Sequence, residues 1–404
     1  MTILAIQYLE SNPGTSTNVQ LEVEKRLRTV LEMMPISLVL IGWDVSESLF
    51  HICRREVDRY GAKLFRWHPL LTGKGGVIPR PEWRVVGLGG ENVPGFRGMP
   101  DFTFMCPNRQ VVQAATLSHL SGVLRTGLFD GIFLDRIRFP SPAADPSQLL
   151  SCFCKECRRA ASDIGLDLAA VKSAFRKMLS SPDQTQKILE LLIDPTSDNS
   201  VDHNSSIIDQ FLRFRVTSIT NMVTMAAKLV HDEELEVGLD TFSPTLTRLV
   251  GQDITALDSC CEWIKVMTYG RTFGPAGLPF EILALSNWLK RVSGLGEMEI
   301  LRLLSRVLRH PMPASMDVFR EYGVEEGVLQ IETERGRSAG VSRLLVGMEL
   351  VDLVGVTNLN ARQIGTDLRA FHEAGADGLV FSWDLWLMPL ERLKLVAREL
   401  KKIW

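Results

Sequence analysis

Continuous apolar runs alternate with apolar stripes of helical spacing along most of this chain. Runs of this kind are typical of parallel strands that are buried on both faces. The predicted strands are residues 3–9, 37–43, 63–71, 131–139, 235–240, 263–269, 343–349 and 378–384. Apolar residues three and four positions apart, as in residues 19–33 and 46–60, predict amphipathic helices between them. Strands that alternate with helices in this number predict an α/β fold, a (β/α)8 TIM barrel.

An open, doubly wound sheet is the alternative arrangement of such elements. Dinucleotide-binding sheets of that kind carry a G-x-G-x-x-G turn after the first strand, and no such motif follows residues 3–9. We therefore predict a single barrel domain over residues 1–404. A helical insertion that contains cysteines is expected at about residues 141–231, after the fourth strand.

The composition adds limits on partners and location. With 45% hydrophobic and 23% charged residues, the chain has the profile of an ordinary globular enzyme. A net charge of −3 and the lack of Lys/Arg-rich runs argue against a nucleic-acid partner. The N-terminus lacks the features of a signal peptide, and no apolar run approaches the ~18 residues of a membrane span. We expect a cytoplasmic protein with no membrane partner, for which a homo-oligomer is an open alternative.

Acidic residues stand at the ends of five predicted strands. They are Asp44, Asp135, Asp240, Glu349 and Asp384. The carboxyl ends of parallel barrel strands meet at one rim, so these acids are expected to converge. Glycoside hydrolysis needs such a pair, because one carboxyl group protonates the leaving oxygen while the other attacks carbon or activates water. We predict that Asp135 is the principal catalytic carboxylate. Asp240 is the first candidate for the acid/base, and Glu349 is the second.

Other side chains near the strand ends are predicted to bind substrate. Aromatic rings stack on the apolar faces of sugars, and polar groups at the rim can hydrogen-bond sugar hydroxyls. Arg136 and Arg138 follow Asp135 directly, and either could orient its carboxylate or contact substrate. The opposing interpretations are packing aromatics, a structural histidine and a salt-bridged rim. The predicted substrate-binding residues are Asp44, His68, Arg138, Tyr269, Trp383 and Asp384.

The spacing of four cysteines predicts a metal site. Cys152, Cys154 and Cys157 form a C-x-C-x-x-C segment, and Cys106 is the candidate for a fourth ligand. Four thiolates complete a tetrahedral zinc site without an open position, so we expect a structural Zn²⁺. An iron–sulfur cluster is the alternative. The chain has seven cysteines, an odd number, which argues against a disulfide framework. No organic cofactor is expected.

Two short motifs resemble known families. Residues 131–140, Gly-Ile-Phe-Leu-Asp-Arg-Ile-Arg-Phe-Pro, resemble the strand-four signature of uncharacterised glycoside-hydrolase-like barrels near the α-amylase superfamily. Residues 266–269 and 382–385 are similar to the strand-six and strand-eight signatures of that group. In such proteins the strand-four aspartate is the expected nucleophile or key acid, and the resemblance gives this role to Asp135.

The cysteine pattern resembles that of the family-42 β-galactosidases. In those enzymes a C-x-C-x-x-C segment after strand four joins an upstream cysteine to bind structural zinc. They carry an Asn-Glu pair with the acid/base at the end of strand four, where this chain has Leu134 and Asp135, so their catalytic residues match less well than their cysteines. Glu349 is the candidate counterpart of their strand-seven nucleophile.

These observations predict a glycoside hydrolase that cleaves a glycosidic bond of a carbohydrate substrate with paired strand-end carboxylates. Two alternatives stay open. One is a non-catalytic carbohydrate-binding barrel, and the other is a sugar lyase, isomerase or epimerase that uses the rim acids with a divalent metal.

Overall fold

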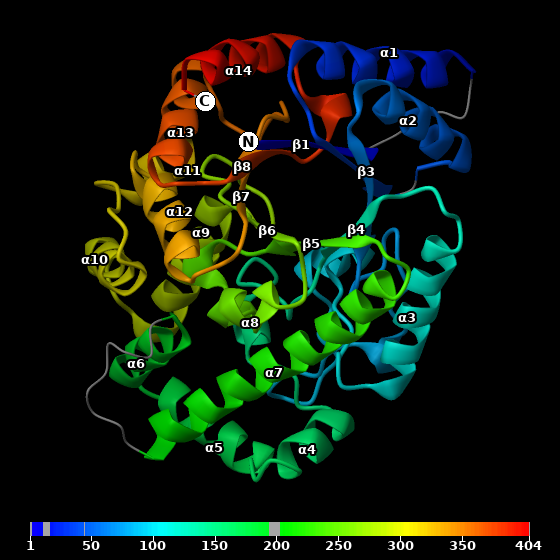
Figure 1. Ribbon diagram of the computed structural model, residues 1–404. Helices are drawn as coiled ribbons and strands as arrows, with labels where there is room; N and C mark the ends of the chain where they lie inside the picture. The colour runs from blue at the N-terminus through cyan, green and yellow to red at the C-terminus, as the bar shows by residue number, and fades with distance from the viewer. Residues whose placement is uncertain (1, 11–16, 44, 194–202, 404) are drawn as a thin grey trace.

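The computed structural model describes residues 2–10, 17–43, 45–193 and 203–403. Eight parallel strands close into a barrel in sequence order (Figure 1). Strand β1 pairs with both β2 and β8. The strands are β1 (Ile3–Glu10), β2 (Leu38–Trp43), β3 (Lys63–Pro69), β4 (Gly131–Asp135), β5 (Glu236–Thr241), β6 (Trp263–Val266), β7 (Leu344–Glu349) and β8 (Gly378–Ser382). The predicted (β/α)8 barrel is confirmed.

Helices surround the barrel on its outside (Figure 1). They are α1 (Thr17–Met33), α2 (Glu47–Tyr60), α3 (Gln110–Leu124), α4 (Lys155–Ser162), α5 (Leu168–Leu179), α6 (Pro182–Ile193), α7 (His203–His231), α8 (Ile254–Asp258), α9 (Leu278–Ser293), α10 (Glu297–Leu308), α11 (Met316–Tyr322), α12 (Val328–Ser338), α13 (Ala361–Glu373) and α14 (Leu390–Ile403). None of the helices in the described part of the chain combines the length and the apolarity needed to cross a bilayer. Single 3₁₀ turns occur at Pro81–Trp83, Phe96–Gly98, Pro100–Phe102, Pro146–Leu149, Pro244–Leu246, Arg248–Val250 and Leu385–Leu387.

Two connections between strands carry several helices each. The connection from β4 to β5 holds α4, α5, α6 and α7, which gather at one side of the barrel (Figure 1). This is the region in which a cysteine-containing helical insertion was expected. The connection from β6 to β7 holds α9, α10, α11 and α12, and the sequence pattern had not predicted the last two of these helices.

The strand side chains alternate between two apolar layers. Phe65, Trp67, Phe133 and Trp263 belong to a small cluster inside the barrel, whereas Ile132 and its neighbours of the same parity belong to the large core beneath the helices. Successive residues of a strand point to opposite faces. Residues two positions beyond the inner cluster on each strand therefore also point inward, at the carboxyl end of the barrel.

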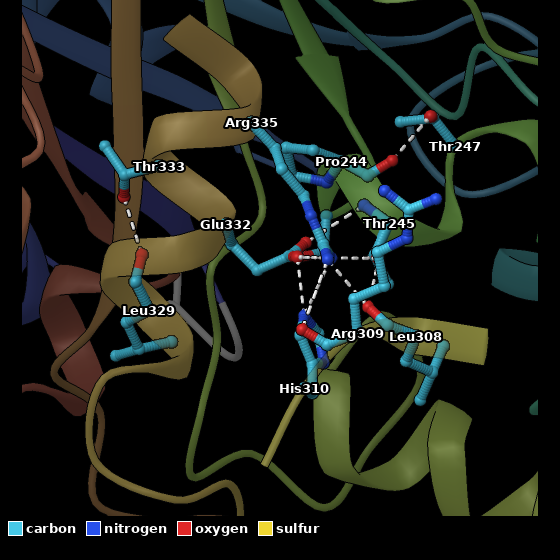
Figure 2. Close-up of polar contacts among 11 residues, drawn as sticks. Pro244, Thr245, Thr247, Leu308, Arg309, His310, Leu329, Glu332, Thr333 and Arg335 are labelled. Atoms are coloured by element: carbon cyan, nitrogen blue, oxygen red, sulfur yellow. Dashed lines mark hydrogen bonds and ion pairs between the residues drawn. The ribbon is translucent and has the colours of Figure 1, made fainter. Parts of the chain in front are cut away.

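A buried polar network ties α12 to the segment after β5 (Figure 2). The carboxylate of Glu332 accepts hydrogen bonds from Arg335 at 2.8 Å and from the amide of Thr245 at 3.0 Å, and it lies 2.8 Å from Nε2 of His310. The second guanidinium nitrogen of Arg335 donates to the carbonyl of Leu308 at the end of α10. These contacts join α12, the segment after β5 and the end of α10.

Candidate active site

A cavity of about 190 Å³ lies at the carboxyl ends of the barrel strands. Two carboxyl groups line it, Asp135 from β4 and Asp240 from β5. Both continue the inward-pointing parity of their strands, so the strand register itself brings them to one space. The lining residues are Gln7, Phe102, Asp135, Arg136, Asp240, Met267, Tyr269, Thr272, Gly274, Pro275, Ala276, Val356 and Trp383.

Asp135 is held by donors that solvate a negative charge. The indole nitrogen of Trp67 donates to Oδ2 at 2.9 Å, and the amide of Arg136 donates to Oδ1 at 2.5 Å. The side chain is only 9% exposed, so these donors take the place of water. Hydrogen bonds of this kind stabilise the ionised form of a carboxyl group.

Asp240 has a contrasting environment. Burial raises the pKa of Asp240 to about 7, against the lowering effect of Lys265 and with a further raising effect from the charge of Asp135. Nζ of Lys265 donates to Oδ2 of Asp240 at 2.9 Å, and the two residues lie opposite each other in the β5–β6 register. Oδ1 of Asp240 has no hydrogen-bond partner among the described residues. The free oxygen belongs to a side chain that lines the cavity.

Lys265 is also anchored on its other side. Nζ donates to Oε1 of Gln7 at 3.2 Å, and the hydroxyl of Ser382 donates to the same oxygen at 2.6 Å. The ammonium lies 5.3 Å from the ring centroid of Tyr269. Although burial alone would lower the pKa of Lys265, its interactions with Asp240 and Tyr269 raise it, so the amine stays cationic.

Two aromatic residues form one wall of the cavity. The rings of Tyr269 and Trp383 meet edge to face, with centroids 6.4 Å apart. Burial raises the pKa of Tyr269 to about 12, although Lys265 lowers it, so the phenol is neutral. A neutral hydroxyl beside an apolar ring suits a sugar, which offers hydroxyls at its edge and an apolar face.

Of the two arginines after Asp135, only Arg136 lines the cavity. The guanidinium of Arg138 is enclosed between the rings of Phe104 and Phe242, 4.4 Å from each centroid, and donates to the carbonyl of Phe139. Burial lowers the pKa of Arg138 to about 9. The structure therefore places Arg138 in the packing between loops and not in the cavity.

Glu349 and Asp384 do not line the cavity. Oε1 of Glu349 accepts the amide of Arg271 at 2.6 Å, and burial, with a contribution from Asp367, raises the pKa of Glu349 to about 8. Asp384 is fully buried and caps the 3₁₀ turn Leu385–Leu387 by accepting the amide of Trp386 at 3.0 Å. Neither carboxyl group is brought together with Asp135 and Asp240 in the cavity.

His68 points away from the barrel interior. It follows the inward Trp67 on β3, so alternation turns its ring outward, where it lies 5.2 Å from the ring of His119. Burial, and after it His119 and Arg66, lowers the pKa of His68 well below its usual value. Asp44, the remaining predicted binding residue, lies outside the described residues.

Lys265 and Gln7 are the site residues that sequence reasoning missed. Lys265 is a charged residue in the middle of an apolar strand, Trp263–Val266, and Gln7 interrupts the apolar run of β1 in the same way. A polar residue inside such a run was the available signal, because a buried charge needs a partner. Its partner could not be named without the strand register.

The four cysteines form a buried cluster whose sulfur atoms all lie within 4.8 Å of one another. Sγ of Cys106 lies 3.6 Å from that of Cys154 and 3.4 Å from that of Cys157. Regular tetrahedral zinc with bonds of about 2.3 Å has S–S edges of about 3.8 Å, close to these separations. Amide donors from Val86, Cys157 and Asn108 point to the sulfur atoms of Cys152, Cys154 and Cys157, respectively. The cluster could therefore hold a metal ion.

A larger cavity of about 430 Å³ lies outside the barrel, between α10, α12 and the segment after β5. Two of its three arginines make structural contacts: Arg335 binds Glu332 and the end of α10, and Arg248 pairs with Asp209 at 2.5 Å. Because the paired carboxyl groups lie in the smaller cavity, the smaller cavity is the candidate active site.

Comparison with known proteins gives fold relatives only. No family model and no curated protein matches the chain. Among solved structures, it is similar to the PgaB (BpsB) glycoside hydrolase domain from Bordetella bronchiseptica, with 12% identity and a TM-score of 0.60 over 98% of this chain and 99% of that one. It is also similar to a class V chitinase from Pseudomonas fluorescens Pf-5, with 10% identity and a TM-score of 0.50 over 99% of this chain and 100% of that one.

A third similar structure is the alpha-L-fucosidase isoenzyme 2 from Paenibacillus thiaminolyticus, with 11% identity and a TM-score of 0.51. The match covers 100% of this chain and 49% of the fucosidase, so the chain spans about half the length of that protein. At identities this low, the matches show only that the chain shares the barrel fold of these glycoside hydrolases. A shared fold alone does not assign an activity.

Proposed function

We propose that this chain is a glycoside hydrolase in which Asp135 and Asp240 are the catalytic carboxyl groups. The observation that carries the proposal is their placement in one cavity in opposite environments. Both side chains are buried, but Asp135 accepts hydrogen bonds on both oxygens, whereas Oδ1 of Asp240 has no partner among the described residues and burial raises the pKa of Asp240 to about 7. A carboxyl group with a raised pKa beside a second carboxyl group in one cavity is an arrangement that glycosidic cleavage uses. The fold relatives support a carbohydrate substrate.

In this mechanism Asp240 is the general acid. Its Oδ1, which has no partner within the described structure, carries the proton to the glycosidic oxygen of the bound substrate. Lys265 stays bonded to Oδ2 and stabilises the carboxylate that forms when the proton leaves. Asp135 acts on the sugar as nucleophile or as the base that activates water. Tyr269 and Trp383 hold the ring.

Asp240 is preferred to Glu349 as the acid because of position. Both groups have a raised pKa, but only Asp240 lines the cavity together with Asp135. A general acid must come within hydrogen-bond reach of the atom that it protonates. Glu349 instead accepts the amide of Arg271.

The leaving group of the substrate tests this assignment. Only poor leaving groups need protonation, so Asp240→Asn should lose far more activity on alkyl glycosides or disaccharides than on 4-nitrophenyl glycosides. Glu349→Gln is the matched control and should affect both classes equally. Equal losses on both classes for Asp240→Asn would show that Asp240 is not the acid and would favour the non-hydrolytic alternatives.

We also propose that Cys106, Cys152, Cys154 and Cys157 bind one structural Zn²⁺. The sulfur separations and the N–H donors to sulfur support a tetrathiolate site, and the resemblance to the zinc segment of the family-42 β-galactosidases favours zinc over an iron–sulfur cluster. Zinc with four protein ligands supplies cross-linking and no open position for chemistry. None of the seven cysteines forms a disulfide bond, and we further propose a reducing compartment such as the cytoplasm.

A further inference from the structure

Arg136 has an unusual backbone for a residue with a side chain. Its φ is 56°, in the left-handed region that favours glycine, and it directly follows Asp135 at the end of β4. Non-glycine residues in this region are uncommon and gather at functional sites, where the surrounding structure holds them. This conformation accompanies the placement of Arg136 in the cavity lining, while Arg138 two residues later packs between loops.

The guanidinium of Arg136 has no hydrogen-bond acceptor among the described residues. It stacks on the ring of Phe102 at 4.4 Å, and its Nε lies 3.8 Å from Oδ2 of Asp135, which is too long for a hydrogen bond. The side chain is 11% exposed. Five N–H donors are thus held at the cavity wall without an acceptor from the part of the chain that the structure describes.

The charges around the cavity leave room for a negative ligand. When Asp240 carries the proton that it donates, Arg136 in the cavity wall and Lys265, which is bonded to Asp240, carry two positive charges against the single negative charge of Asp135. Buried charge without compensation is costly. A planar pair of acceptor oxygens matches the guanidinium fork, and a carboxylate provides it with full negative charge.

We infer that Arg136 is a specificity-determining residue that binds the carboxylate of an acidic sugar, so that the substrates are glycosides of uronic acids. The inference rests on the proposed glycoside hydrolase function and names its substrate class. Phe102 holds the guanidinium plane by stacking, and the left-handed backbone fixes the direction from which the side chain approaches.

Matched pairs of aryl glycosides test the inference. We would measure kcat/KM for 4-nitrophenyl glucuronides against glucosides and galacturonides against galactosides, in both anomeric forms. The intact protein should prefer the uronide. Arg136→Met should lower the uronide-to-hexoside ratio roughly 10- to 100-fold, the scale of a lost hydrogen-bonded contact between charged groups. Arg136→Lys keeps the positive charge but loses the forked guanidinium. Its uronide-to-hexoside ratio should fall between those of the intact protein and Arg136→Met.

Arg97→Met is the control. Arg97 also has a positive φ, of 51°, and also stacks on a phenylalanine, Phe96, at 5.0 Å, but it does not line the cavity. The ratio should stay unchanged in Arg97→Met. Two results would overturn the inference and leave Arg136 as a partner of Asp135 only. The intact protein could have the same kcat/KM on hexosides as on uronides, or Arg136→Met could lower kcat/KM equally on both sugars.

A binding measurement separates this inference from the proposed hydrolase function. Calorimetric titration with free glucuronate and galacturonate should show binding that glucose and galactose lack, and Arg136→Met should abolish it. If uronates bind in this way but no glycoside is cleaved, the hydrolase proposal fails and the acidic-sugar site stands. If neither uronates nor uronides interact with the folded protein, the acidic-sugar site is refuted. Arg136→Lys serves for the same titration if Arg136→Met does not fold.

Discussion

Nζ of Lys265 lies 2.9 Å from Oδ2 of Asp240, and neither side chain is more than 3% exposed. The two residues are direct neighbours across the β5–β6 register, so a shift of either strand would separate them. The pair has two effects on the proposed acid. Lys265 limits the rise in the pKa of Asp240 that burial causes, and it keeps a positive charge beside the oxygen that becomes negative.

Lys265→Met should move the alkaline limb of the kcat/KM profile to higher pH. In the intact protein this limb should lie near pH 7, where the protonated Asp240 is lost. Without the ammonium, the carboxylate is less stable, so the pKa of Asp240 rises further, by roughly one unit or more. The measurement is kcat/KM against pH between about pH 5 and 9 on a substrate with a poor leaving group. Lys265→Arg retains the charge, and its limb should stay near that of the intact protein; an unmoved limb in Lys265→Met would refute the coupling.

Asp135→Asn should abolish most activity without unfolding the protein. The amide is nearly isosteric, and its oxygen can still accept the indole N–H of Trp67, but it cannot act as a nucleophile or base. We expect a loss of at least about 10³ in kcat, the scale seen when an essential group is removed, with an almost unchanged thermal midpoint.

Asp130→Asn is the matched control for that experiment. Asp130 precedes β4 at its opposite end, where it pairs with Arg54 at 2.6 Å. Its removal should cost some stability and leave kcat within a few-fold. Activity of Asp135→Asn within tenfold of the intact protein would reduce Asp135 to a binding or structural role.

The cysteine cluster should contain about one zinc ion per chain in protein purified under reducing conditions. Cys154→Ser should release the metal and lower the thermal midpoint, because a structural site contributes its binding energy to folding. Cys260→Ser, a buried cysteine outside the cluster that contacts Thr224, should keep the metal. Elemental analysis decides the outcome, and iron in place of zinc would favour the iron–sulfur alternative.

The barrel could be predicted from the sequence because its strands are continuous apolar runs. Strand-end position also led to Asp135, Asp240, Tyr269 and Trp383, which all line one cavity. The same rule could not predict that Glu349 would accept a hydrogen bond from the amide of Arg271 and would not line the cavity.

Two other assignments depended on different information. His68 could have been placed outward by strict alternation from Trp67, which packs inside the barrel. The position of Arg138 could not be predicted in this way, because it is enclosed by Phe104 and Phe242, which come from distant parts of the chain. The contact of Lys265 with Asp240 follows from the β5–β6 register, which the sequence alone does not reveal.

Glu332→Gln should destabilise the protein in a pH-dependent way while leaving the active site intact. Burial would raise the pKa of Glu332, but the hydrogen bond with His310 and the charges of His310 and Arg335 outweigh it, so the pKa is lowered. A carboxyl group with a lowered pKa contributes stability above its unfolded pKa and loses this contribution as pH falls through its folded pKa. Glutamine does not titrate, so the stability gap between the two proteins should be largest near pH 7 and should shrink on acidification.

We expect a gap of roughly 3 kcal/mol at neutral pH, at the low end for a broken buried ion pair because Arg335 is partly exposed. Urea titrations at several pH values measure this gap, and kcat/KM at a temperature where both proteins are folded should be equal. A gap that stays constant with pH would mean that shape, and not the charge of Glu332, holds α12 against the segment after β5.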